Sequence, residues 1–171
     1  AGPVVTTPPS WQFERPARFT VGAIGEPGSR LFYFQAFADG TEVAVKCEKQ
    51  QAAALAEHLT TLMQDLEGPA VDAGPIEALP PSDLAFVVGS ISLGLDADAQ
   101  RLVVVLEELL VDSESGEPLD REPARLRVHL DREQVAGLLA QIADLTAGSR
   151  PICRLCDRPI DPDGHACPRL N

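Results

Sequence analysis

The sequence predicts an α+β protein made of two β-β-β-α units, in which antiparallel strands are covered by two helices. The first observation is an internal repeat, because residues 43–62 reappear as residues 126–145 after a shift of 83 positions. The second is the pattern inside each copy, where apolar residues alternate as in a strand and then recur at helical spacing. The third is a run rich in proline and glycine between the copies. We therefore expect a body at residues 11–149, with repeat one at 19–67, a linker at 68–83 and repeat two at 84–148.

In the first copy, alternating apolar residues predict strands at 19–24, 30–38 and 41–47, with a short edge strand before them at 11–14. The turns between them have the right composition, since Glu26-Pro-Gly28 and Asp39-Gly40 are typical of tight turns. In the second copy, residues 86–91 resemble residues 19–24, and a long strand is expected from Arg101 to Val111. The loop at 112–122 is acidic and is expected to be exposed.

The last strand of each copy leads directly into a helix. One face of these strands carries the expected core residues Val43, Val45 and Cys47 in the first copy and Leu126, Val128 and Leu130 in the second. Asp131 and Gln134 have the spacing of a capping box, whereas Glu48 is a poorer cap for the first helix. Gly68-Pro69 and Gly148 are expected to end the helices. Two such units most simply combine around a pseudo-two-fold axis over one core.

Composition bounds the partners and the compartment. The formal net charge is −12: residues 1–149 carry 10 Lys and Arg against 23 Asp and Glu, and residues 150–171 carry 4 against 3. This acidity disfavours nucleic acid as a partner. No apolar run is long enough to span a bilayer and no secretory signal opens the chain, so we expect a soluble protein without a membrane partner. Cys47 has no obvious disulfide partner, which favours a reducing, cytoplasmic compartment.

The C-terminal tail, residues 150–171, holds the clearest chemical motif. Cys153 and Cys156 form one ligand pair, and His165 and Cys167 form a second. Between them, Asp161-Pro-Asp-Gly164 has the composition of a tight turn that folds the tail back into a hairpin. Three thiolates and one imidazole complete the tetrahedral shell of a structural zinc ion, with no open position for water or substrate. A redox Cys-x-x-Cys pair, iron–sulfur ligation and free thiols are the alternatives.

Other candidate residues favour structural roles. His129 alternates with core residues and is expected to face solvent, and His58 is expected on a helix flank. Cys47 is expected to be a small buried apolar residue. Glu107 and Glu108 are adjacent on a strand, so they point to opposite faces and do not form an acid and base pair.

Four segments carry a family resemblance: FTVGAIGEPGSRLFYFQA, EKQQAAALAEHL, DADAQRLVV and CRLCDRPIDPDGHACPRLN. They are similar to an actinobacterial family of uncharacterised proteins, described as repeat proteins or as a domain of unknown function. The resemblance spans residues 13–171 and implies a bacterial cytoplasmic protein, without an activity to transfer.

Three functions follow from these patterns. The first is a non-enzymatic interaction or scaffold protein, whose zinc-bound tail presents or locks the surface for a protein partner, because no catalytic constellation is assembled in the sequence. The second is an enzyme or ligand-binding protein with its site between the two copies. The third is a nucleic-acid-binding zinc ribbon, which the charge of the body disfavours.

Overall fold

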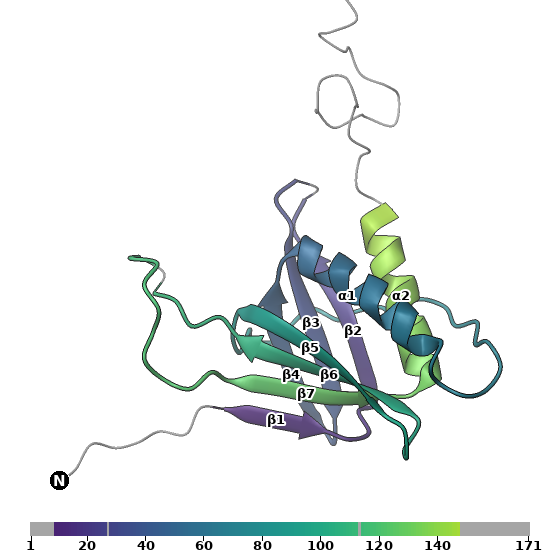
Figure 1. Ribbon diagram of the computed structural model, residues 1–171. Helices are drawn as coiled ribbons and strands as arrows, with labels where there is room; N and C mark the ends of the chain where they lie inside the picture. Colours follow the sequence, from purple (N-terminus) through teal and green to yellow (C-terminus); the bar gives the residue numbers. More distant parts are fainter. Residues whose placement is uncertain (1–8, 27, 113, 148–171) are drawn as a thin grey trace, which may run out of the picture.

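The computed structural model describes residues 9–26, 28–112 and 114–147, and the fold of these residues is α+β, as predicted. The elements in chain order are β1 Ser10–Phe13, β2 Arg18–Ile24, β3 Leu31–Ala38, β4 Thr41–Cys47, α1 Lys49–Met63, β5 Val88–Asp96, β6 Arg101–Glu108, β7 Arg125–Leu130 and α2 Arg132–Ala147. Figure 1 shows the strands on one side of the molecule and the two helices packed side by side against them.

The strands form two sheets that join at one point. One sheet has the order β2-β3-β4 and the other β1-β7-β6-β5, and neighbouring strands are antiparallel except that β1 is parallel to β7. The peptide groups of residues 85–87 connect the sheets. The Ala85 N–H donates to the Ala44 carbonyl at 2.7 Å, and the Leu109 N–H donates to the Val87 carbonyl at 2.7 Å. The short edge strand expected at 11–14 is present as β1.

One continuous apolar core lies between the sheets and the helices. The predicted core faces of the two repeated strands are confirmed, because the six residues expected there are at most 3% exposed. They are Val43, Val45 and Cys47 on β4 and Leu126, Val128 and Leu130 on β7. The capping box at the start of α2 is also confirmed, since the Gln134 N–H donates to an Asp131 carboxylate oxygen at 2.8 Å. A Phe19–Phe34 stack, with ring centroids 5.8 Å apart, fills the centre of the three-stranded sheet.

Each helix contacts a strand of the other half of the chain. Helix α2 packs on β2, and α1 packs on β5 and β6. In addition, the Gln141 side chain on α2 donates to the Val21 carbonyl on β2 at 2.9 Å. The two halves therefore share their core instead of forming separate domains.

Three elements differ from the expectations, and one of them is the strand expected at residues 86–91, which runs instead as β5 from Val88 to Asp96. Helix α1 ends at Met63, five residues before Gly68, because the following N–H groups of Asp65 and Leu66 bond three residues back, to Leu62 and Met63, and tighten the last turn. The strand expected to reach Val111 ends at Glu108. Beyond it, the Asp112 carboxylate accepts the N–H groups of Glu114 and Ser115 and forms a turn instead.

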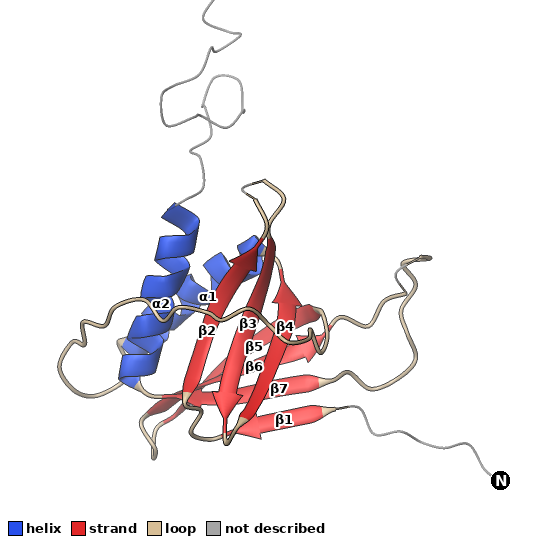
Figure 2. Ribbon diagram, turned by 180° about the vertical axis from the view of Figure 1, so that it is seen from behind, coloured by secondary structure: helices blue, strands red, loops and turns tan. Residues whose placement is uncertain are grey.

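The linker packs on the protein, although it contains neither helix nor strand. Figure 2 shows it crossing the outer face of β2, β3 and β4, and we call residues 74–82 the strap. The Tyr33 hydroxyl donates to the Leu79 carbonyl at 2.7 Å. The Gln35 amide both donates to that carbonyl, at 3.0 Å, and accepts the Leu79 N–H, at 2.9 Å. The Thr20 hydroxyl donates to the Ile76 carbonyl. These contacts explain why three polar side chains on the outer face of a sheet are buried.

Candidate binding groove

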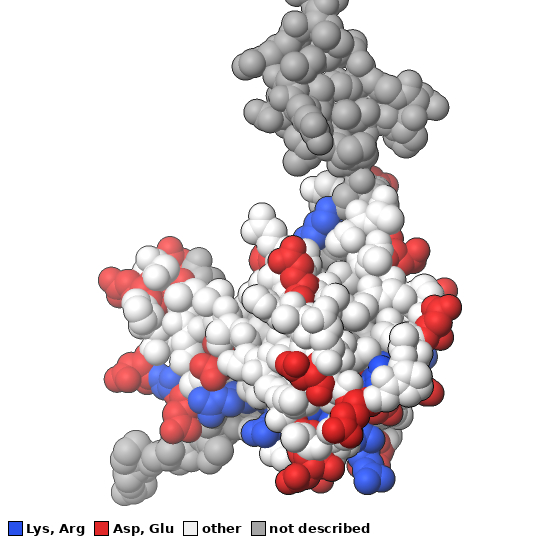
Figure 3. Space-filling view, turned by 45° about the vertical axis from the view of Figure 1, so that its right-hand side comes forward, with Lys and Arg blue, Asp and Glu red and all other residues white. Residues whose placement is uncertain are grey.

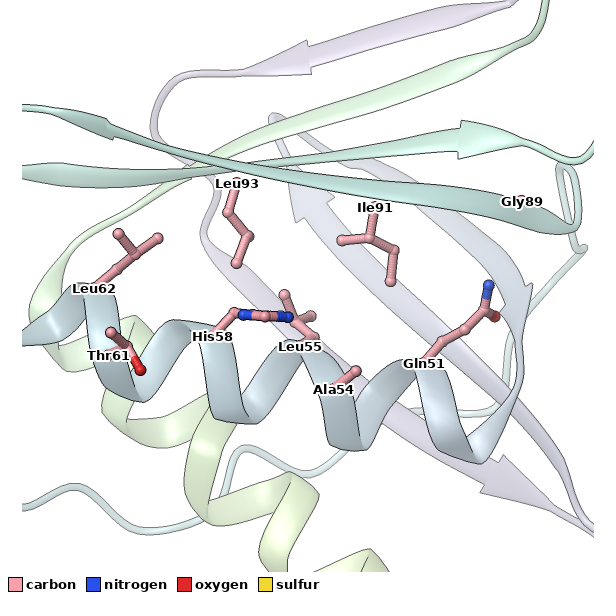
Figure 4. A pocket seen from close by; sticks show the side chains of 9 residues that line it. All are labelled: Gln51, Ala54, Leu55, His58, Thr61, Leu62, Gly89, Ile91 and Leu93. Carbon is pink, nitrogen blue, oxygen red and sulfur yellow. The ribbon is translucent and has the colours of Figure 1, made fainter.

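A groove of about 550 Å³ lies between α1 and β5 (Figure 4). It is lined from α1 by Gln51, Ala54, Leu55, His58, Thr61 and Leu62, and from β5 by Gly89, Ile91 and Leu93. Since α1 belongs to the first half of the chain and β5 to the second, both halves contribute to its walls. The volume falls within the range of small-ligand and peptide-side-chain pockets.

The positions of the lining residues follow from the periods of the two elements. On α1, Ala54, His58 and Thr61 are three or four residues apart and share one flank, while Leu55 next to them turns into the core and is 2% exposed. On β5, Ile91 and Leu93 are two residues apart and point toward the helix (Figure 4). Both are partly buried against the core. The groove is therefore a partly filled extension of the core that opens to solvent.

Most polar groups of the groove are engaged in structural hydrogen bonds. The Gln51 amide accepts the Glu48 N–H at 2.8 Å and donates to the Val88 carbonyl at 3.2 Å, which ties the start of α1 to the start of β5. The Thr61 hydroxyl donates to the Glu57 carbonyl at 3.3 Å. The His58 imidazole lies along α1, next to Leu55 (Figure 4). No carboxylate is among the lining residues, so they do not supply a paired acid and base. Their chemistry suits the binding of an apolar group.

Cys47 is a buried thiol, as predicted. It is 2% exposed and faces the core, and burial, followed by the charge of Glu48, raises the pKa of its thiol to about 12. The thiol stays protonated near neutral pH and is a poor nucleophile.

The two adjacent glutamates have structural partners, on opposite sides of the strand end. Glu107 accepts a bond from the Arg125 guanidinium at 2.8 Å. Glu108 binds Arg121, with contacts of 2.7 and 2.9 Å. The bond to Arg121 is the main reason why the pKa of Glu108 lies below its ordinary value.

The expectation for His129 is wrong. Its side chain was expected to face solvent, but it is 9% exposed and accepts a bond from the Arg127 guanidinium at 3.3 Å. The ring lies on the outer face of β7 opposite Val103 of β6, beside the Arg127 side chain. His58 does lie on a helix flank, as predicted, and there it faces the groove.

The four predicted zinc ligands, Cys153, Cys156, His165 and Cys167, lie outside the described residues. Within the described ranges, no group of three or more His, Cys, Asp or Glu side chains is arranged to hold a metal ion. No helix in those ranges is both long and apolar enough to cross a membrane.

The geometry defines the class of protein: an α+β body with a shared core, a packed strap and an apolar groove between its halves. The chain belongs to the protein family of unknown function DUF3090, whose model matches residues 11–167. No curated protein and no solved structure matched the chain.

Proposed function

We propose that this protein is a non-catalytic interaction protein, in which a duplicated body carries a zinc-bound tail that forms or locks the surface for a protein partner. The observation that carries this proposal is the groove, which is open and mainly apolar and has no carboxylate beside its histidine. Such a surface suits the burial of a peptide segment better than proton transfer.

Strand register supports the duplication. Val21, Phe34 and Val45 stand side by side on β2, β3 and β4, and Leu93, Val104 and Val128 stand side by side on β5, β6 and β7. Val45 and Val128 are also 83 residues apart, the shift of the sequence repeat. This register makes Leu93 the counterpart of Val21. The sequence motif at residues 86–91 would instead select Val88, which lies five residues before Leu93. The pairing also shifts between Val88 and Ser90, so the motif and the register select different counterparts of Val21.

The crossed packing of the helices also supports the duplication. The first strand of each unit is covered by the helix of the other unit, α2 on β2 and α1 on β5. An exchange of this kind is expected when two similar units are related by a pseudo-two-fold axis.

The family match supports the tail as an integral part of this protein, because it extends to Cys167 and so includes all four proposed ligands. Their spacing favours a closed zinc shell in a structural role.

We expect one zinc ion per chain when the protein is purified without added metal. Elemental analysis of the reduced protein measures it, and Cys156→Ser should lower the content to near zero, because one ligand of four is lost. Cys47→Ser is the matched control and should leave the zinc content unchanged, since Cys47 is buried in the body. Protein that is reduced and folded but free of zinc would refute the metal site.

The partner is tested by photocrosslinking in the native host. Photoreactive p-benzoylphenylalanine replaces Arg154 in the tail, and Glu117 in the exposed loop serves as the control position. One protein crosslinked from position 154 and absent from position 117 is expected. Identical products at both positions, or none from position 154, would count against the proposal.

The second candidate is a small-ligand binder, which the volume of the groove favours. Native mass spectrometry would detect a bound small molecule in the purified protein. A molecule lost in Ala54→Trp and kept in Ala53→Trp would favour this candidate over the scaffold.

The setting of the protein is part of the proposal. We propose a bacterial, actinobacterial origin and a cytoplasmic location, supported by the family resemblance and by the free, buried thiol of Cys47. Nucleic acid is not expected as a partner: Figure 3 shows acidic side chains spread over the face in view, and the chain has 26 Asp and Glu against 14 Lys and Arg.

A further inference from the structure

The strap places one isoleucine against the α2 and β2 elements. The Ile76 side chain covers Gly137 of α2 so closely that a Cβ on Gly137 would lie 2.6 Å from its terminal carbon. The Ile76 N–H donates to the Gly137 carbonyl at 3.4 Å, and the Thr20 hydroxyl of β2 donates to the Ile76 carbonyl. The next residue, Glu77, accepts a bond from Arg18 at its carbonyl. Pro75-Ile76-Glu77 is thus anchored through its middle residue.

The groove between α1 and β5 is the counterpart of this site in the second half. A shift of 83 residues places Ala54 of α1 at the position of Gly137, and His58 at the position of Gln141. Strand register places Leu93 at the position of Val21 and Ser92 at the position of Thr20, so a hydroxyl is kept. Ala54, His58 and Leu93 line the groove (Figure 4).

The outer face of β5 repeats a second feature of the strap site. Gly22 of β2 lies under the strap, where an added Cβ would be 2.6 Å from the Cβ of Ala78. By register its counterpart is Gly94 of β5, and no atom of the described residues lies within 4 Å of a Cβ added there. A second covering segment can therefore approach β5 as the strap approaches β2.

The sequence supplies a matching segment at the same distance from the second helix. Ile76 is 13 residues beyond Met63, the last residue of α1, and Ile160 is 13 residues beyond Ala147, the last residue of α2. Its neighbours also match, because Pro75-Ile76-Glu77 corresponds to Pro159-Ile160-Asp161.

We propose that Pro159-Ile160-Asp161 of the tail binds in the groove between α1 and β5, as Pro75-Ile76-Glu77 binds between α2 and β2. The Ile160 side chain packs against Ile91 and Leu93, and its carbonyl accepts the Ser92 hydroxyl. This inference rests on the proposed duplication. Charge favours the contact, because residues 150–171 carry four Arg against three Asp, whereas residues 1–149 have a net charge of −13.

The segment lies between the two proposed zinc-ligand pairs, after Cys156 and before His165. A zinc ion that joins these pairs closes a short loop with Ile160 inside it. Closing the loop in advance lowers the entropy cost of placing that side chain in the groove.

The test uses the full chain with p-benzoylphenylalanine in place of Arg158, just before the segment. Crosslinks within one chain to residues of α1 or β5 that line the groove are expected, and mass spectrometry of the digest locates them. Ala54→Trp fills the groove and should reduce the crosslink yield at least tenfold. Ala53→Trp adds the same side chain at the neighbouring exposed position outside the groove and should leave the yield unchanged.

Crosslinks to other elements, crosslinks between two chains, or equal yields in the two tryptophan variants would overturn the inference. Zinc content measured on the same samples separates the two proposals. Groove crosslinks in protein without zinc uphold the docking and refute the metal site, whereas bound zinc without groove crosslinks refutes the docking and leaves the metal site in place.

Discussion

Gln35 makes more hydrogen bonds to the strap than the other buried polar residues on the outer face of the first sheet, Thr20 and Tyr33. It is fully buried, and its amide group binds both backbone groups of Leu79 and, at 3.3 Å, a carboxylate oxygen of Glu42. Burial also raises the pKa of the neighbouring Tyr33 hydroxyl, followed by the charge of Glu42, so Tyr33 remains a donor to the same carbonyl. The strap is therefore recognised as a backbone, in the manner of a bound peptide.

We expect Gln35→Ala to lower the free energy of unfolding by about 1–3 kcal/mol, because the Leu79 N–H loses its side-chain partner, whereas the Leu79 carbonyl keeps the Tyr33 hydroxyl. Urea denaturation measures this loss, and hydrogen exchange at the Leu79 amide should become faster. Gln64→Ala, at an exposed position, is the control and should change stability by less than about 0.5 kcal/mol. Equal effects of the two substitutions would contradict this role of Gln35.

Thiol reactivity should separate Cys47 from the other three cysteines of the chain. In the presence of a metal chelator, three thiols should react quickly at pH 8 with a disulfide reagent, and the fourth should react once urea unfolds the body. The reason is the burial that raises the pKa of Cys47 to about 12. Four fast thiols in folded protein would contradict the buried position.

At the scale of elements, the loop between β6 and β7 is held by the contact between Arg121 and Glu108. The folded-state pKa of Glu108 is lowered, so the contact adds stability above the ordinary pKa of a glutamate, and this contribution is lost as the pH falls through the folded-state pKa. Because Arg121 is half exposed, solvent screens the contact and its contribution to stability is small.

We therefore expect Arg121→Ala to lose more stability relative to the native chain at pH 7 than at pH 3, as measured by urea denaturation. Arg15→Ala, which removes an exposed cation, is the control and should behave alike at both pH values. A difference for Arg121→Ala that is as large at pH 3 as at pH 7 would show that the charge on Glu108 is not involved.

The positions of the helices and strands are predicted well from the sequence. Strict alternation and helical spacing locate the strands and helices, because these periods decide which side of an element is buried. Asp131 and Gln134 identify the start of α2, since their bonds are local. The burial of Thr20 and Gln35 cannot be predicted in this way, because their hydrogen-bond partners are more than 40 residues away, in the strap. On an alternating strand, these polar residues suggest a face that is exposed to solvent. The groove is equally hidden, because its walls come from elements that meet through tertiary packing.

At the scale of the whole molecule, the described body contains a complete core without the tail. We expect a chain truncated after Ser149 to fold and to unfold cooperatively, since all strands and both helices remain. Circular dichroism and urea denaturation measure this. An unfolded truncated chain would show that the tail is needed for the core.

The crossed helices have a consequence for synthesis. Helix α2 is the last element of the body to leave the ribosome, yet it covers β2, one of the first strands made. Until α2 emerges, the apolar side of β2 has no permanent cover, and the chain carries exposed core residues for most of its synthesis. At about 5–20 residues per second, that interval lasts many seconds. The order in which this chain is made therefore sets when it is most exposed to aggregation and most dependent on chaperones.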